Sequence, residues 1–509
     1  MAARTKTLPD DPVELKKIIA RLQNQVDYLN EQFRLAQHKR FAASTEVAPG
    51  QEDLFNEAEQ EADLDSLAPE EPKETQDTSC GKKKPKRKPL PKDLPREEII
   101  HDISEADKVC ACCQSEMHAI GDERSERLEY TPASFKVIEN IRLKYSCRQC
   151  EKNNTQVNLQ IAPVPASPIP KSIATPSLLS QIIVQKYQYA LPLYRQEAVF
   201  RQCGVEINRK TMANWIIACS VLLDPVIKRL KSHLLAQPVI HADESPLKVI
   251  QDDKQKSYMW CYCTGTDSPN KKPENDKNDT KNIVLYDYQP SRAGECAADY
   301  LQGYNKYLLV DGYAAYEQTE ATLVGCMAHA RRKFIEAQRG QVKGKTGKAD
   351  WAINHIKKLY RVESQFKDRP IDKRYRARQI ESKVLLEQFK TWLDKSSIQV
   401  PPKSLIGVAI HYSLNQWEKL ARYIDGGHLS IDNNRAERAI KPFVIGRKNW
   451  MFSTSAKGAK ASANLYSLVE TAKANGIEPY EYINRLLTDI PSRQCKDDLS
   501  DLMPWNLKG

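Results

Sequence analysis

The segment from residue 238 to residue 338 constrains the fold most, because strand-like and helix-like runs alternate there in a fixed order. Three runs rich in β-branched and aromatic residues come first, and polar turns separate them. A helical run, two further strands and a basic helix follow. The runs cover residues 238–250, 257–265, 282–290, 292–304, 306–316, 322–329 and 330–338. This order predicts a mixed α/β domain built on a central sheet.

Two aspartates lie on this predicted sheet. The element order is that of a ribonuclease-H-like fold, in which the first and fourth strands are neighbours; Asp243 lies within the first and Asp311 ends the fourth. A buried carboxylate is costly unless its charge is compensated, and two on adjacent strands repel each other. A divalent cation with oxygen ligands, Mg²⁺ or Mn²⁺, would relieve both costs. For Asp311 alone, the alternative is an aspartate that caps the turn after its strand.

The stretch DNNRAERAIKP, residues 432–442, places one glutamate among amide and cationic groups. Apolar residues at helical spacing predict a core-facing stripe of Ala436, Ala439, Ile440 and Phe443. A second row at the same spacing, one step round the helix, lies at the border between core and solvent: Asn434, Glu437, Arg438 and Lys441. Glu437 could therefore reach a cation held by the two aspartates. The alternative is a solvated helix face of mixed charge.

The ends of this helix, and its basic continuation, have their own signals. Asp432 is expected to cap its start, and Pro442 to mark its end or a kink. Arg447 and Lys448 follow, and with Asn434, Arg438 and Lys441 they are expected to contact DNA phosphates. Glu244, adjacent to Asp243, is expected to face away from the metal, because successive strand residues point to opposite faces.

Four cysteines in two C-x2-C pairs predict a zinc ribbon over residues 99–160. Cys110 and Cys113 form the first pair, and Cys147 and Cys150 form the second. Four thiolates can close a tetrahedron around Zn²⁺, and the residues between the pairs are strand-like. The gap is longer than the commonest spacing and Cys112 is a spare thiol, so buried structural cysteines are the alternative.

A C-x2-H motif, Cys326 and His329, follows the fifth predicted strand. It could orient active-site residues or bind a second zinc ion. The alternative is a packed cysteine beside a hydrogen-bonded histidine, since no partner pair is evident in the sequence.

The amino-terminal region predicts a helix and then a linker. Over residues 12–40 the apolar residues alternate steps of four and three, as in a coiled-coil seam. The seam consists of Leu15, Ile19, Leu22, Val26, Leu29 and Phe33. One helix packed on its own chain is the alternative. Residues 41–98 have the composition of a disordered linker, acidic and then basic. Its basic run reads as a phosphate-contacting arm, comprising Lys82, Lys83, Lys84, Lys86, Arg87 and Lys88.

Residues 171–232 are expected to form a helical, helix-turn-helix-like domain that binds DNA. One helix runs to Cys203 and Gly204, and Asn208 can cap the next. The expected DNA contacts lead that second helix: Asn208, Arg209, Lys210 and Asn214. A plain helical hairpin has the same pattern.

The composition agrees with a nucleic-acid partner. Lys and Arg number 77 against 66 Asp and Glu, a net charge of +11. No stretch approaches the roughly 18 apolar residues of a membrane span, and the first residues lack the apolar core of a secretion signal. Thirteen cysteines without an export signal indicate reduced thiols. We therefore expect a cytoplasmic protein.

Several long blocks together resemble a known family. LKYSCRQC, HADESPLKV, VDGYAAY, CMAHARRKF and the segment beginning DNNRAERAIKP are similar to DDE transposases of the bacterial insertion-sequence family sixty-six, often called TnpC. The resemblance covers nearly the whole chain. It implies that the catalytic triad is Asp243, Asp311 and Glu437, that the ends of the element are the DNA substrate, and that 3′-hydroxyl groups are joined to target DNA.

The resemblance also completes the expected organisation. The fold class is multidomain α/β, with the ribonuclease-H-like domain at 236–340 and 426–490, a helical insertion at 341–425 and a tail at 491–509. Partners are double-stranded DNA, a second or further copies of the chain, and accessory proteins of the same element. A nuclease of the same fold that never joins ends, and a DNA-binding regulator without catalysis, are the alternative functions.

Overall fold

A computed structural model describes residues 11–41, 135–145, 160–252, 256–266, 280–341, 346–493 and 498–507. The chain divides into two compact units, one of residues 1–68 with 162–509 and one of residues 69–161. The four cysteines of the predicted ribbon and the basic arm at 82–88 lie outside the described residues. Within the second unit, β1 (Lys144–Tyr145) pairs with β2 (Gln160–Ile161) in antiparallel register.

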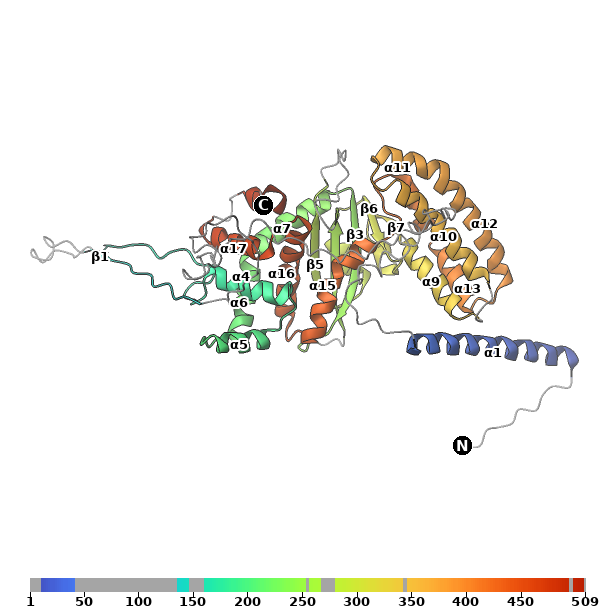
Figure 1. Cartoon of the computed structure of the whole chain (residues 1–509), viewed down its shortest axis with the longest axis horizontal. Coiled ribbons are helices and arrows are strands. Elements are labelled where there is room, and N and C mark those ends of the chain that lie inside the picture. Colours follow the sequence, from blue (N-terminus) through green and yellow to red (C-terminus); the bar gives the residue numbers. More distant parts are fainter. Residues whose placement is uncertain are drawn as a thin grey trace, which may run out of the picture. The chain divides into compact units, whose positions relative to one another are not determined.

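A five-stranded mixed sheet forms the centre of the first unit (Figure 1). Its order is β5-β4-β3-β6-β7, in which β3, β4 and β5 are antiparallel neighbours and β6 and β7 run parallel to β3. The strands are β3 (Val239–Leu247), β4 (Ser257–Thr264), β5 (Ile283–Gln289), β6 (Tyr307–Val310) and β7 (Thr322–Gly325). The predicted order of elements is confirmed, and β3 lies directly beside β6.

Alternation along the parallel strands divides the apolar residues between two cores. On β6, Leu308 and Val310 belong to one core, whereas Leu309 between them belongs to the other. Leu323 and Val324 on β7 divide in the same way. Successive side chains of a strand point to opposite faces, so each strand is covered on both sides, as parallel strands require.

Both edges of the sheet are covered by helical segments. At the β5 edge, Val284 N donates to Thr471 Oγ1 at 3.0 Å and Tyr286 N donates to Ser467 Oγ at 2.8 Å, both on α16 (Ala456–Ala474). At the β7 edge, Arg422 donates to the carbonyl of Leu323. These contacts satisfy backbone groups that an open edge would expose to other chains.

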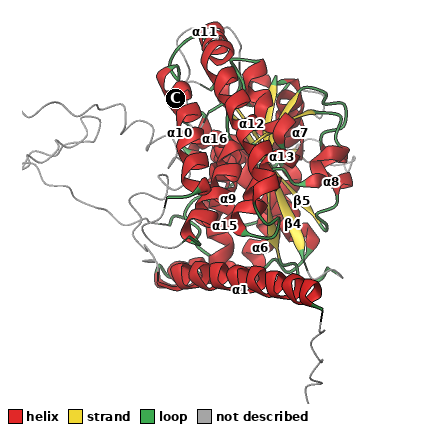
Figure 2. Cartoon of the chain, turned by 90° about the vertical axis from the view of Figure 1, so that its right-hand side faces the viewer, coloured by secondary structure: helices red, strands yellow, loops and turns green. Residues whose placement is uncertain are grey.

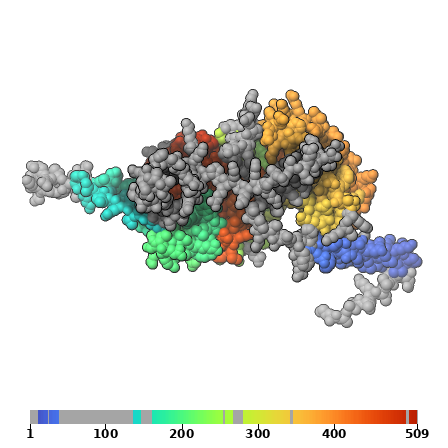
Figure 3. Space-filling model, viewed as in Figure 1, coloured from blue at the N-terminus to red at the C-terminus, as the bar shows by residue number. Residues whose placement is uncertain are grey.

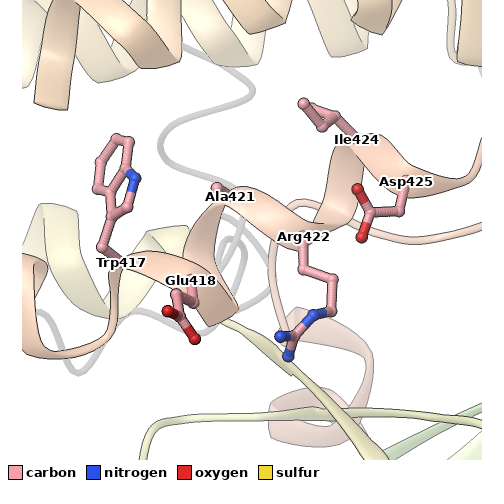
Figure 4. A pocket seen from close by; sticks show the side chains of 6 residues that line it. All are labelled: Trp417, Glu418, Ala421, Arg422, Ile424 and Asp425. Atoms are coloured by element: carbon pink, nitrogen blue, oxygen red, sulfur yellow. The ribbon is translucent and has the colours of Figure 1, made fainter.

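The cover of the β7 edge consists of α14 (Trp417–Ala421) and η5 (Arg422–Asp425). A surface hollow is lined by this segment, and in Figure 4 the Arg422 side chain points toward the strands while Trp417 points the other way. Because Arg422 is bonded to the edge of the sheet, we regard this hollow as a feature of the edge cover rather than as the functional site.

Helices surround the sheet, and Figure 2 shows them in red around the yellow strands. Before the sheet come α4 (Pro176–Tyr187), α5 (Leu193–Gln202), α6 (Arg209–Leu222) and α7 (Asp224–Ala236). Within it come α8 (Gly294–Tyr300), η3 (Ala314–Gln318) and α9 (Met327–Arg339). The insertion contains α10 (Lys348–Gln365), α11 (Ile371–Ala377), η4 (Arg378–Ser382), α12 (Lys383–Gln399) and α13 (Leu405–Asn415). After it come α15 (Asn434–Trp450), α16, α17 (Pro479–Asp489) and the short turns η6 (Ile490–Ser492), η7 (Ser500–Leu502) and η8 (Pro504–Asn506).

The helices of residues 171–232, expected as a DNA-binding domain, share the larger core with the sheet. Met212 and Trp215 of α6 and Leu230 of α7 belong to the same apolar cluster as strands β3 to β5. The turn between α5 and α6 contains Gly204 at φ +78°, a conformation that glycine adopts without strain. Asn208 caps α6 as expected, since its Oδ1 accepts from Thr211 N at 2.8 Å.

The helix α1 (Pro12–Phe41) presents two different faces, and Figure 3 shows it in blue. One face contacts the same unit: Arg34 Nε donates to Gly340 O at 2.8 Å, Leu405 N donates to Glu31 Oε2 at 3.1 Å, and Leu35 is buried. The predicted seam is on the other face. Its members from Ile19 to Phe33 are each 50 to 62% exposed within this chain.

Among the described residues, no single helix has both the length and the apolar character needed to cross a membrane. The bent pair α6 and α7 meets that criterion together, on length and composition alone.

Candidate functional site: a group of carboxylates beside a Cys-His pair

Asp243 lies in the middle of β3, on the central strand of the sheet. Its register partner on β4 is Cys261, and its Oδ1 accepts from Glu244 N at 2.9 Å. Burial raises the pKa of Asp243 well above its usual range, and the negative charges of Glu244, Asp311 and Glu437 raise it further. The Asp243 carboxyl therefore lies in the field of three other acidic groups.

Asp311 follows β6 directly, beside the strand that carries Asp243. Its Oδ1 accepts from Tyr313 N at 2.9 Å, which closes a tight turn. Gly312 within this turn has φ +96°, and a Cβ atom there would lie 3.1 Å from Tyr412 Oη. Tyr412, on α13 of the insertion, donates to the carbonyl of Asp311 at 2.6 Å. The insertion thus fixes the backbone of the loop that carries Asp311.

Glu437 lies in the first turn of α15 and is buried, only 7% exposed. Its Oε2 accepts from Arg332 Nη2 at 2.5 Å, and its Oε1 lies 3.5 Å from His329 Nδ1. Both partners are on α9. In this conformation the glutamate is therefore paired with the Arg332 guanidinium and lies beside the His329 imidazole, although its charge reaches Asp243.

Glu244 faces the opposite side of the sheet, as expected from alternation along β3. Its register partner is Trp260, and its side chain, 2% exposed, accepts from Arg292 Nε at 2.9 Å and from Tyr316 Oη at 2.6 Å. Arg292 lies just before α8, and Tyr316 lies in η3, so both precede β7 in the chain. Even so, burial and then the nearby Asp311 charge raise the pKa of Glu244, against the lowering effect of its hydrogen bonds.

The DNN sequence before α15 holds this helix against the sheet and α9. Asn433 donates from Nδ2 to Ala242 O at 2.7 Å, its Oδ1 lies 3.1 Å from His241 Nδ1, and its backbone N donates to Cys326 Sγ at 3.2 Å. These contacts position the start of the helix that carries Glu437. Asn433 occupies the N-cap position without a side-chain cap bond, whereas Asp432 Oδ1 accepts from Asn434 N at 3.2 Å, so Asp432 caps the start of α15 as expected.

Two expectations about α15 are corrected. The expected helix end at Pro442 is wrong, since α15 continues to Trp450 with Pro442 inside it. Asn434, predicted as a phosphate contact, is buried and donates from Nδ2 to Asp432 Oδ2 at 2.9 Å. The core-facing stripe is confirmed, because Ala436, Ala439, Ile440 and Phe443 are all buried.

The predicted basic contacts differ in accessibility. Asn208, Arg209, Lys210, Asn214 and Lys448 are exposed, and Arg438 and Lys441 are half-buried. Arg447 bonds within the chain, to the carbonyl of Pro246 and to Ser245 Oγ at 3.3 Å. The surface of α6 and the end of α15 thus offer polar and cationic groups to an anionic partner.

Cys326 and His329 follow the strand β7, as expected for the motif, and they lie at the start of α9. The expected strand at 322–329 ends at Gly325, and Cys326 is the N-cap of α9. Cys326, His329 and Glu437 each offer a ligand atom, and these atoms lie within 4.8 Å of one another. Within the described ranges, no other group of three such side chains meets this spacing.

Arg332 and Tyr412 also belong to the site, and neither was predicted from the sequence. Arg332 has a weak local signal, because it follows His329 by three residues and so shares its helix face. Tyr412 has none: its contact with Asp311 spans 101 residues of sequence.

Four protein-family descriptions match this chain, and together they cover most of its residues. The description "Transposase IS66 family" matches residues 171–461, and "zinc-finger binding domain of transposase IS66" matches residues 107–151. "IS66 C-terminal element" matches residues 467–505, and "Transposase C of IS166 homeodomain" matches residues 28–99.

Relatives of this chain include proteins of Sinorhizobium fredii that are described as uncharacterized. The protein y4jD is 30% identical over 100% of this chain and 98% of its own length. The protein y4qI is 32% identical over 84% of this chain and 79% of its own length. With family descriptions matching from residue 28 to residue 505, the chain belongs to the IS66 family of transposases.

Proposed function

We propose that this protein is the catalytic transposase of an insertion sequence. It binds the terminal inverted repeats of its element, cleaves the DNA at the ends and joins the freed 3′-hydroxyl groups to target DNA. The observation that carries the proposal is the adjacency of β3 and β6, which brings Asp243 beside Asp311 with Glu437 in electrostatic range. The strand order and directions of the sheet support a ribonuclease-H-like core.

The donor chemistry of Asp243, Asp311 and Glu437 suits a divalent cation. All three offer hard oxygen ligands. Burial raises the pKa of Asp243 first, and the charges of Glu244, Asp311 and Glu437 raise it further, a repulsion that such a cation would offset. They would hold Mg²⁺ or Mn²⁺. When bound, such ions activate the attacking hydroxyl and stabilise the leaving oxygen of a phosphodiester.

The protein's own contribution is to position these carboxylates. Tyr412 and Gly312 hold the Asp311 loop, and Asn433 holds the start of α15 against β3. Glu437 would exchange its contact with Arg332 for the cation when it joins the two aspartates. Rigid support of this kind matters because a misplacement of about 1 Å can cost 10²-fold in rate.

DNA binding is proposed for several parts of the chain. Residues 107–151 match the zinc-finger domain of the family and contain Cys110, Cys113, Cys147 and Cys150, which we propose as the four ligands of one Zn²⁺. The basic arm at 82–88 and the exposed start of α6 would add phosphate contacts. We further propose that the chain acts in the bacterial cytoplasm as a homodimer or higher oligomer, with accessory proteins of its element.

The test combines purified protein with labelled DNA ends from its own element, plasmid DNA and Mg²⁺. The proposal expects labelled ends covalently joined to the plasmid, and no joining by the Asp311→Asn variant. Cleaved ends without joined products would indicate a nuclease of this fold. Ends that are bound but remain uncut would indicate a regulator.

A further inference from the structure

Three side chains of different chemistry meet where α9 begins. Cys326 is the N-cap of α9, His329 lies in the first turn of that helix, and Glu437 comes from the first turn of α15. Their sulfur, imidazole nitrogen and carboxylate oxygen lie within 4.8 Å of one another. Cys326 is 1% exposed and Glu437 is 7% exposed, so this group lies largely beneath the surface.

The atoms that face one another in this group lack hydrogen-bond partners. Within the part of the chain that the structure describes, His329 Nδ1 and Glu437 Oε1 are both buried and unbonded, and they lie 3.5 Å apart. Buried polar atoms of folded proteins are nearly always satisfied, so two that face each other point to a missing partner. A cation between them and the sulfur would satisfy both.

Arg332 lies against the other polar atom of each of two side chains, Glu437 and His329. Its Nη2 donates to Glu437 Oε2 at 2.5 Å, and its Nη1 lies 3.4 Å from His329 Nε2. The 3.4 Å separation between Arg332 Nη1 and His329 Nε2 is too long to fix the imidazole tautomer. The bond to Glu437 is short, so Arg332 holds Oε2 and leaves Oε1 directed at His329.

Cys326 has two features that favour a thiolate. Its side chain lies at the N-terminus of the 13-residue helix α9, and its Sγ accepts from Asn433 N at 3.2 Å. Burial opposes this and raises the pKa of the free thiol. The binding of a thiophilic cation would displace the proton.

We propose that Cys326, His329 and Glu437 form a binding site for a zinc-class cation, and that filling this site withdraws Glu437 from the catalytic carboxylates. Mixed sulfur, nitrogen and oxygen donors suit Zn²⁺, and three protein ligands leave a fourth position for water. With Oε1 on the cation and Oε2 on Arg332, Glu437 has no oxygen left for the catalytic metal. This second part rests on the proposed function, whereas the site itself does not.

The first measurement is the zinc content of the reduced full-length chain after loading and removal of excess metal. Cys326→Ser should hold one zinc fewer than the wild type, and His329→Gln should agree. Cys296→Ser is the matched control, because Cys296 is a partly exposed thiol on α8 outside the group. Circular dichroism checks that each variant is folded. Equal zinc content in the wild type and both site variants overturns the site.

The second measurement is the inhibition of Mg²⁺-dependent end cleavage by added zinc, with each variant normalised to its own zinc-free rate. The half-inhibiting zinc concentration should rise ~10-fold or more in Cys326→Ser. Even mutations of residues that only support the ligands lower metal affinity by about 10-fold or more, so the loss of a ligand should cost at least as much. Equal inhibition of wild type and variant overturns the withdrawal of Glu437. The zinc content does not depend on activity, so a wild type that fails to cut DNA contradicts the proposed function alone.

Discussion

Tyr412 Oη donates a hydrogen bond of 2.6 Å to the backbone carbonyl of Asp311, and this contact joins the helical insertion to the carboxylate loop. The bond lies at the boundary between α13 and the end of β6, and Gln416 and Tyr412 both lie against Gly312. The insertion therefore has a direct structural role at the site, in addition to any contact with DNA.

Tyr412→Phe should lower the rate of end cleavage about 10-fold while it costs only about 1 kcal/mol of stability, the usual value of one hydrogen bond. The reason is that the Asp311 loop loses its anchor but keeps its turn. Single-turnover cleavage and thermal unfolding measure the two effects. Tyr189→Phe is the control, since Tyr189 is 64% exposed. Equal rates for both variants would show that the bond does not position Asp311.

Gly312→Ala should impair both stability and cleavage, whereas Gly204→Ala should affect stability alone. Both glycines have positive φ, +96° and +78°, so alanine costs each roughly 1–2 kcal/mol. Only at Gly312 would the new Cβ meet a neighbour, Tyr412 Oη at 3.1 Å; at Gly204 nothing lies within 4 Å. Denaturant unfolding measures the backbone strain that both variants share, and the cleavage rate measures the crowding of the site that only Gly312→Ala should cause. A comparable loss of cleavage in both variants would show that crowding at Gly312 has no separate effect.

Asp243→Asn should stabilise the metal-free protein at neutral pH. The folded-state pKa of Asp243 is raised, first by burial and then by neighbouring carboxylates, so the folded state binds the proton more tightly than the unfolded state. Stability from this group is therefore lost as pH rises from the unfolded pKa through the folded one. The gain in melting temperature for Asp243→Asn, measured in chelator, should shrink as pH falls toward 4. A gain that is absent at pH 7, or larger at pH 4, would contradict the raised pKa.

Replacing Leu22 and Leu29 with Lys should shift the protein toward monomer. These seam residues are 50% and 56% exposed within one chain, so their burial requires a second copy. Sedimentation velocity measures the shift. Ala20→Lys with Asp27→Lys adds lysines off the seam and should leave the assembly unchanged. Identical sedimentation profiles for the seam variant and the wild type would indicate that α1 packs only on its own chain and does not drive self-association.

Patterns of short range were predictable from the sequence. The alternation of β3, the helical stripe of Ala436, Ala439 and Ile440, and the Asn208 cap all depend on neighbours within one element, and the structure confirms each. The adjacency of β3 and β6 followed from the order of the elements.

Features set by tertiary packing were not predictable. The Pro442 ring removes one helical hydrogen bond, yet Phe443 and Gly446 beyond it are buried, and this packing carries α15 on to Trp450. The pairing of Arg332 with Glu437 joins residues 105 positions apart, so neither local sequence reveals it. The burial of Asn434 has the same origin, since the DNN segment lies between β3 and α9.

The most direct measurement compares Glu437→Gln with Glu244→Gln in the joining of element ends to plasmid DNA with Mg²⁺. Glutamine keeps the size and polarity of each glutamate side chain but removes its negative charge. Only at Glu437 is that charge expected to bind the catalytic metal. The account predicts that Glu437→Gln loses cleavage and joining yet still binds element ends. It predicts that Glu244→Gln, whose side chain is held by Arg292 and Tyr316 on the other face, keeps substantial activity. Joining by Glu437→Gln at near wild-type rates would contradict the assignment of Asp243, Asp311 and Glu437 as the catalytic triad.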